Sequence, residues 1–399
     1  MYDISLSSKL DKELLDIAEH LMSHKFHDNE IGLMGGKCGN LMFFFEMYSY
    51  TKDEIYLNHA IQLLESIYSS FEDIPIEPHF SFGLTGFGAT LNYISENFIS
   101  IDTDVVFSDL DDFLFSKGKN LILSSNFDFL HGSIGLGIYF LEKPHNKIYF
   151  DLIELLVDRL YEEAIVSQDG SVKWFFRDLK GNVTYNMGLS HGIPSVLVFL
   201  TKCYKLNIKS EKCLFLIKGA IDFVMSVKFD QFVSGSFFPY AVPLEGVNSA
   251  KSRLGWCYGD LGVCVALWCV SSISSFSYLQ DFVVDVLTFN TSRFTESSSS
   301  VEDASFCHGS SGIAYIYHDF YLKTGNKIFL DFAQTWYNKS MDYKRLFESG
   351  SQYFYLESTL TRFERIDPGL LEGLSGIGLS YLSFLKKEKG SWDKVLLLA

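Results

Sequence analysis

Two short segments of the chain carry side chains that could bind a metal ion. Residues 253–259 read RLGWCYG, and residues 306–309 read FCHG. The two thiolates and the imidazole that they offer are a set that zinc accepts, and three protein ligands leave a fourth position open. An open position is typical of a catalytic zinc, whereas a structural zinc is closed by four protein ligands. Cys257, Cys307 and His308 are therefore the candidate zinc ligands.

A glycine pattern that recurs along the chain places these two segments at equivalent positions. The pattern is Gly-x-x-Gly followed by an apolar run, and in one unit Ser195 stands where the second glycine would fall. Successive units are 47 to 67 residues apart, which leaves room for two helices and their loops. The first glycines of the units are Gly36, Gly83, Gly132, Gly192, Gly259, Gly309 and Gly373.

The residues before and after these glycines differ in their hydrophobic pattern. Before them, apolar residues recur at helical spacing, as at Leu10, Leu14 and Ile17. After them, the runs are apolar on nearly all faces, as in 263–268 (VCVALW), which is typical of a buried helix. Each unit therefore predicts an amphipathic outer helix, a loop and a buried inner helix. We expect seven such hairpins to form an all-α fold, an α/α toroid or double α-barrel, as a single domain over residues 1–399.

Two stretches depart from the helical pattern. Residues 172–176 and 183–185 flank Lys180-Gly181-Asn182, a combination that is typical of a β-hairpin. Residues 229–250 contain glycines and prolines without helical spacing, and we expect a loop near the site there.

The composition argues against some partners and compartments. The formal net charge is −16, with no basic stripe that could neutralise phosphates, so we expect no nucleic-acid partner. Seven cysteines are an odd number and lie far apart, which favours a reducing compartment over a disulfide framework. The N-terminus has no signal-peptide pattern, and no apolar run approaches the roughly 20 residues that span a bilayer. We expect a cytoplasmic protein that does not span a membrane.

The motifs resemble those of the lanthionine synthetase C-like (LanC) cyclases. The most specific are WCYG at 256–259, CHG at 307–309 and GLSHG at 188–192, and the resemblance covers nearly the whole chain. It implies an α/α toroid with zinc at its mouth. It also implies an activity, which is to close lanthionine or methyllanthionine rings in a precursor peptide by adding cysteine thiols to dehydroalanine or dehydrobutyrine. The length suits a stand-alone class I cyclase, whose implied partners are a dehydratase and a peptide transporter.

The resemblance gives each candidate site residue an implied role. Zinc on the three ligands would deprotonate a substrate thiol, which is a weak nucleophile at its ordinary pKa of about 8.5. Addition of the thiolate leaves an enolate that must be protonated, and His191 is implied as the acid/base. Asp128 would either orient His191 or take the thiol proton, and the sequence leaves both open. Arg253 would stabilise the enolate or hold Asp128, and Tyr258 would hydrogen-bond the developing oxyanion.

Some of these residues also have purely structural interpretations. Asp128 could cap the helix that follows it, and Asp260 is expected to do so at its own helix. His131 occupies the place of His191 in the third unit, but lining or packing is the favoured interpretation. Cys38 is expected to be a packing residue. Because Ser195 replaces the second glycine of its unit, only the geometry of the helix start after Gly192 is in doubt.

Other functions share parts of the pattern. A LanC-like enzyme that adds glutathione or another small thiol to dehydroamino acids would use the same zinc residues. A non-catalytic toroid that binds peptides would have no need of His191 and Asp128. An α/α-barrel glycosidase needs two carboxylates that face a sugar cleft, and Asp128 has no obvious partner carboxylate. The cyclase is therefore the interpretation that we favour.

Overall fold

The computed structural model of the chain is dominated by helices. It describes residues 1–71, 77–99, 103–143, 147–177, 181–245, 251–347, 350–353, 355–356, 364–365 and 367–398. Among these residues, no helix has the length and apolar character needed to cross a membrane.

Each glycine unit marks the start of an inner helix, as the sequence predicts. The first glycine of each unit is the N-cap residue, and in five of the units the next residue donates its N–H to the carbonyl seven residues upstream, at 2.8–3.0 Å. The loop before the helix is thereby closed on itself. The inner helices are α2 (Lys37–Thr51), α4 (Leu84–Asn97), α6 (Ser133–Leu141), α8 (Ile193–Lys205), α11 (Asp260–Ser271), α14 (Ser310–Thr324) and α16 (Leu374–Lys386).

The substitution of Ser195 for the second glycine does not alter its helix start. Gly192 caps α8 in the same extended conformation as the capping glycines of other units. The buried Ser195 hydroxyl donates to the carbonyl of Gly192 at 2.8 Å, so its polar atom is satisfied within the helix itself.

The outer helices alternate with the inner ones along the chain and bury a single stripe. In α1 this stripe includes Leu6, Leu10 and Leu14, at the spacing that the sequence predicts. In contrast, α14 is buried on all its faces over residues 310–320. The outer helices are α1 (Ile4–Ser23), α3 (Glu54–Ser70), α5 (Thr103–Leu123), α7 (Lys147–Glu162), α9 (Ser210–Ser226), α12 (Leu279–Asn290) and α15 (Lys327–Asp342).

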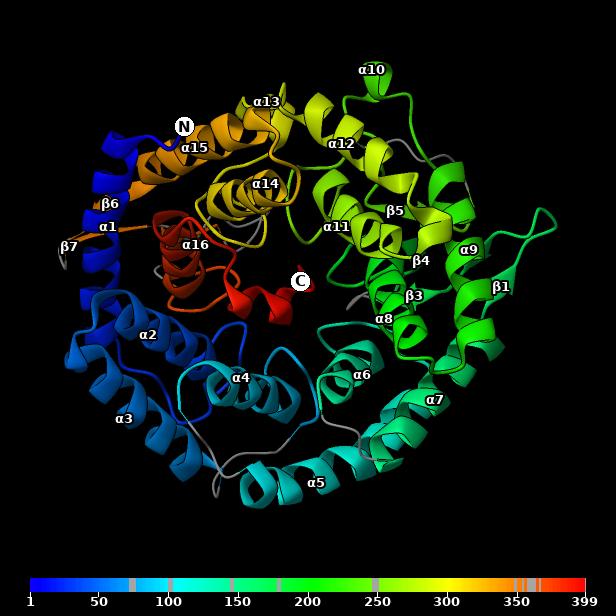
Figure 1. Cartoon of the computed structure of the whole chain (residues 1–399), viewed down its shortest axis with the longest axis horizontal. Helices are drawn as coiled ribbons and strands as arrows, with labels where there is room; N and C mark the ends of the chain where they lie inside the picture. The colour runs from blue at the N-terminus through cyan, green and yellow to red at the C-terminus, as the bar shows by residue number, and fades with distance from the viewer. Residues whose placement is uncertain are drawn as a thin grey trace. The chain divides into compact units, whose positions relative to one another are not determined.

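The chain divides into two compact units, each with an inner and an outer layer of helices (Figure 1). In the first unit, α1 packs on α16, α3 on α2 and α15 on α14. In the second unit, α7 packs on α6, α9 on α8 and α12 on α11. The first unit comprises residues 1–77, 81–103 and 301–395, and the second comprises 78–80, 104–300 and 396–399.

The described strands are short, and they correct two predictions. The hairpin exists as β3 (Phe176–Arg177) with β4 (Val183–Asn186), but β2 (Val172–Lys173) pairs instead with β1 (Ile165–Val166). The prediction of a loop over 229–250 was wrong in part, because β5 (Ala241–Pro243) pairs with the other edge of β4. An unpaired edge of β4 would leave backbone groups unsatisfied, and β5 satisfies them. Residue 180 of the turn and residues 246–250 lie outside the described residues.

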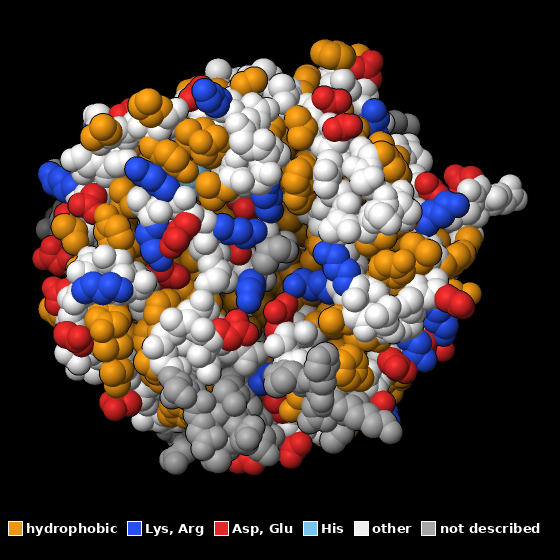
Figure 2. Space-filling model, viewed as in Figure 1, with side chains coloured by type: hydrophobic (Ala, Val, Ile, Leu, Met, Phe, Trp, Pro, Cys, Tyr) orange, Lys and Arg blue, Asp and Glu red, His pale blue; other side chains and the backbone are white. Residues whose placement is uncertain are grey.

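The remaining short elements connect or follow the helices. The chain has α10 (Gln231–Ser234), α13 (Glu296–Ser299), η1 (Ser274–Phe276) and η2 (Ser391–Leu396), with the strands β6 (Lys344–Phe347), β7 (Gly350–Tyr353), β8 (Tyr355–Leu356) and β9 (Glu364–Arg365). On the face drawn in Figure 2, both basic and acidic side chains are present at the surface.

Candidate metal centre and its surroundings

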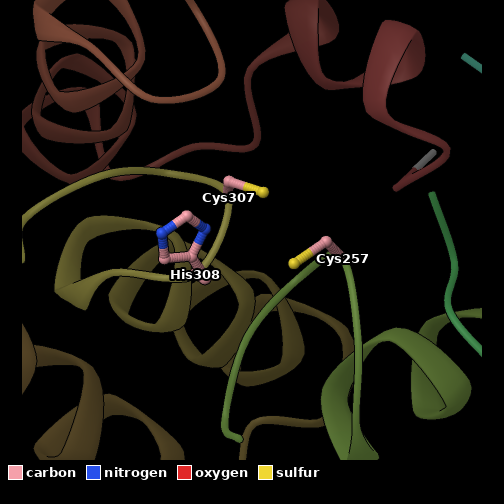
Figure 3. A group of neighbouring side chains, drawn as sticks. All are labelled: Cys257, Cys307 and His308. Atoms are coloured by element: carbon pink, nitrogen blue, oxygen red, sulfur yellow. The ribbon is translucent and has the colours of Figure 1, made fainter. Parts of the chain in front are cut away.

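The side chains of Cys257, Cys307 and His308 converge (Figure 3). Their ligand atoms all lie within 4.8 Å of one another, and the two cysteines are 7% and 6% exposed. An ion with tetrahedral bonds of about 2.0–2.3 Å keeps its ligand atoms roughly 3.3–3.8 Å apart. The observed spacing is close to this, and a set of two soft thiolates and an imidazole suits zinc. The three residues therefore fit a metal centre.

The imidazole of His308 is oriented by a buried carboxylate. Nε2 of His308 lies 3.3 Å from Oδ2 of Asp303, so His308 would hold a metal ion through Nδ1. Burial raises the pKa of Asp303, but hydrogen bonding and the charge of His308 outweigh burial and lower the pKa overall. A carboxylate behind a histidine ligand fixes its tautomer and ring plane.

Asp303 was not among the predicted site residues, although its position carries a recognisable pattern. It lies six residues before the capping glycine, where other units have Asn126, Asn186 and Asp367. Each of these side chains accepts the backbone N–H two residues further on, at 2.7–3.2 Å. This local turn is the reason why Asn or Asp recurs at the start of the loop. The same position in the unit that contains Cys257 is Arg253.

Backbone hydrogen bonds between neighbouring loops hold the two cysteines. Within the first unit, the N–H of Cys307 donates to the carbonyl of Leu371 at 2.7 Å, and the N–H of Leu371 donates to Met34 at 2.9 Å. Within the second unit, the N–H and the hydroxyl of Ser190 both donate to the carbonyl of Cys257, at 3.4 and 3.3 Å. The loops therefore restrain one another, and each cysteine is fixed by more than its own helix.

The turn after Cys257 requires glycine. Gly259 has φ of +91°, whereas the capping glycine of α14 has an extended backbone. An L-residue rarely adopts this φ, and a Cβ at Gly259 would also overlap the carbonyl oxygen of Arg253. Glycine thus permits the sharp approach of the loop that presents Cys257 and Tyr258.

His191 and Asp128 form a hydrogen-bonded pair in the second unit. Nδ1 of His191 lies 2.6 Å from Oδ2 of Asp128, while Oδ1 accepts the backbone N–H of His131 at 2.8 Å. Burial lowers the pKa of His191, but the bond to Asp128 outweighs it and the pKa is raised. Burial conversely raises the pKa of Asp128, which these bonds lower overall. Asp128 is not the cap of α6, because its carboxylate joins the loop of His131 to the ring of His191.

Tyr240, which was not a predicted site residue, contacts both Tyr258 and Arg253. The ring of Tyr258 lies 6.2 Å from that of His191, and its hydroxyl accepts a hydrogen bond from Asn186 at 3.2 Å. Tyr240 packs edge-on against Tyr258 at 5.7 Å, and its hydroxyl accepts from N and Nε of Arg253 at 2.9 and 3.3 Å. Tyr240 directly precedes β5, in the segment expected to be a loop.

Asp260 is a buried anchor and not the expected helix cap. Its carboxylate accepts the backbone N–H groups of Phe237 and Phe238 at 2.9–3.1 Å and pairs with Arg293 at 3.3 Å. Burial raises the pKa of Asp260, and the charge of Arg293 and the hydrogen bonds to the carboxylate lower it by less. Because Asp260 is the first residue of α11, it ties the segment leading to Tyr240 to the helix that follows Cys257.

The fold and the Cys/His cluster define a helical protein with a candidate metal centre at the starts of two buried helices. Residues 27–397 match the family described as lanthionine synthetase C-like protein. The chain belongs to this family, and the resemblance found in the sequence is confirmed. A comparison with curated protein sequences gives no match.

Solved structures with the same architecture include nisin cyclase. It is 18% identical, with a TM-score of 0.77, and the match covers 99% of this chain and 98% of that one. The likeness shows the fold, and the predicted α/α toroid is confirmed. Weaker matches are to a possible GH105 family member from Salmonella enterica (11% identity, TM-score 0.50, 95% and 94% covered) and the alpha-1,6-mannanase GH76A from Salegentibacter sp. (10%, 0.49, 94% and 99%).

Proposed function

We propose that this protein is a zinc-dependent lanthipeptide cyclase, which forms lanthionine or methyllanthionine rings in a dehydrated precursor peptide. The observation that carries the proposal is the convergence of Cys257, Cys307 and His308 in a chain of the LanC-like family. The nisin cyclase fold supports it, since that name describes a ring-closing enzyme. The chain acts as one domain over residues 1–399, in the cytoplasm, with a dehydratase and a peptide transporter as partners.

The reaction is an addition that needs no oxidant or reductant. A cysteine thiol of the peptide adds to the carbon–carbon double bond of dehydroalanine or dehydrobutyrine. A carbon–sulfur bond forms at the β-carbon, the thiol proton is lost, and a proton is added to the α-carbon. When bound to its three ligands, zinc supplies the Lewis acidity that turns the substrate thiol into a thiolate at neutral pH.

The residues of the chain then hold and move protons. His191 donates the proton to the α-carbon, and Asp128 favours the protonated form of the ring because it raises the pKa of His191. The 2.6 Å bond to Asp128 favours the orienting role for Asp128 over that of accepting the thiol proton. The hydroxyl of Tyr258, held by Asn186, donates to the developing enolate oxygen. Arg253 supports this tyrosine through Tyr240.

The first test is metal content beside ring formation. Zinc in the purified wild type is expected at about one per chain, and Cys257→Ala and Cys307→Ala should each lose most of it. Cys38→Ala is the matched control, since burial raises the pKa of this thiol to about 12 and it stays a packing residue.

Ring closure leaves the peptide mass unchanged, so free thiols are counted by alkylation and mass spectrometry. The wild type and Cys38→Ala should protect the thiols of a dehydrated peptide, and the two ligand variants should not. Zinc-free wild type would contradict the metal centre. If the protein adds glutathione to dehydroamino acids but does not cyclise the peptide, its function is that of a small-thiol transferase and not of a cyclase.

A further inference from the structure

His131 occupies the same place in its loop as His191, Tyr258 and His308 occupy in theirs. Each of the four directly precedes the glycine that caps its inner helix. In all four loops this residue is half-buried, whereas the residue before it is buried. The loop geometry therefore turns this one side chain out of the packed loop, and in three of the four loops it is a proposed site residue.

The contacts of His131 lead to the acid/base pair by two routes. Its ring is stacked on that of His191, with centroids 5.7 Å apart and planes at 18°. Its backbone N–H donates to Oδ1 of Asp128, the carboxylate whose Oδ2 holds Nδ1 of His191. The ring of His79 also meets that of His131, edge-on at 6.1 Å and 82°. The imidazole of His131 thus contacts the ring of His79 as well as the ring of His191.

We propose that His131 is a positioning residue, whose ring plane fixes the orientation of the His191 imidazole for proton transfer. The inference rests on the proposed function of His191. A single hydrogen bond at Nδ1 leaves the His191 ring free to tilt about that bond, and the terminal torsion of histidine is broad. A parallel ring against one face restricts this tilt. Proton transfer depends steeply on such orientation.

The charge state of His131 is compatible with this role. Burial lowers the pKa of His131, and the charges of His191 and His79 lower it further, against the carboxylate of Asp128. A neutral His131 ring does not repel His191 when His191 carries a proton.

The test compares His131→Phe with His131→Ala. Both variants keep the backbone N–H to Asp128, but only phenylalanine keeps a flat ring. We expect kcat for cyclisation to stay within about twofold of the wild type for His131→Phe, and to fall about tenfold for His131→Ala with KM little changed. His59→Ala, on the outer helix α3, is the control for removal of a histidine, and melting curves confirm that each variant is folded.

A second readout does not depend on activity. In protein labelled with ¹⁵N-histidine, the proton between His191 and Asp128 should give a resolved NMR resonance in the wild type and in His131→Phe. It should be broadened by exchange in His131→Ala. If the peptide is not cyclised by the wild type, the proposed function fails, yet this resonance still tests the positioning role.

Two results would overturn the inference. If both variants keep the wild-type rate and resonance, the ring of His131 has no effect on His191. If both lose the rate equally, the imidazole nitrogens matter and the plane of the ring does not.

Discussion

The carboxylate of Asp128 makes two hydrogen bonds with different consequences. One oxygen fixes its own loop through the N–H of His131, and the other raises the pKa of His191. The residue types at this site were readable from the sequence, because thiolates, imidazoles and a carboxylate each have a chemistry. Their partners were not. The position of Asp303 follows the Asn/Asp pattern of the loops, but its contact with His308 depends on how that loop folds, and Tyr240 meets Tyr258 from a different segment of the chain.

Replacing Asp128 by asparagine should lower the pKa of His191 below its ordinary value of about 6.5. The charge and the charge-assisted bond that raise the pKa are removed, while burial, which lowers it, remains. His191 would then be mostly neutral at pH 7, and cyclisation should slow by about 100-fold or more. Histidine NMR titration measures the pKa. Asp169→Asn, at an exposed turn, is the control, and an unchanged His191 pKa in Asp128→Asn would contradict the pairing.

At the scale of the elements, the second glycine of a unit allows the loop to lie close to its helix. At Gly312 and Gly376 an added Cβ would overlap the carbonyl oxygens of Phe306 and Leu370. The residue after Phe306 is Cys307, so the same close approach that packs the loop also places a proposed ligand. The sequence predicted the helix starts because glycine marks them, but it could not predict this second task.

Gly312→Ala should therefore lower zinc content as well as stability. The loop must move away from α14, which costs about 1–3 kcal/mol and displaces Cys307. Gly219→Ala in α9 is the control, since its Cβ would overlap Cγ2 of Val172 in a helix that carries no proposed ligand. It should lower the melting temperature while zinc stays bound. If Gly312→Ala is destabilised but still binds zinc fully, the packing of the loop against α14 does not determine the position of Cys307.

The β-structure shows where the element predictions failed. Residues 172–176 look like one strand because Val, Trp and Phe favour strands, yet residues 174–175 belong to no strand and β2 and β3 join different sheets. The partner of β4 on its other edge is β5, more than fifty residues later. Strand propensity depends on such partners, so a single sequence cannot assign them.

At the scale of the whole molecule, the repeat determines the architecture. The spacing of the glycines and the change from striped to wholly apolar runs predicted the alternation of outer and inner helices. The alternation follows because a helix that is apolar all round must be covered, and an amphipathic outer helix has one face to cover it, as α3 does for α2 and α15 for α14. The repeat does not predict how the N-terminal end of the chain is held. In the first unit, the hydroxyl of Tyr2 bonds to Nε2 of His318 in the middle of α14 at 2.9 Å.

This fastening should make the stability depend on pH through His318. Burial lowers its pKa from 6.5 to about 4, with the charge of Asp319 acting in the opposite direction. Above pH 6.5 the ring is neutral in both the folded and the unfolded chain, and its full contribution to stability is present. Between pH 6.5 and 4 the unfolded chain binds a proton that the folded chain does not. The free energy of unfolding therefore decreases as the pH is lowered through this range, by up to about 3 kcal/mol.

Asp393 in the same unit changes stability in the opposite direction over part of this range, because burial raises its pKa to about 6. The test is therefore a difference between wild type and His318→Gln, whose amide can keep the bond to Tyr2 without titrating. Urea unfolding at pH 7.5 and at pH 4.5 should show the wild type losing stability relative to the variant at the lower pH. A difference that is the same at both values would mean that His318 is protonated as easily in the folded chain as in water.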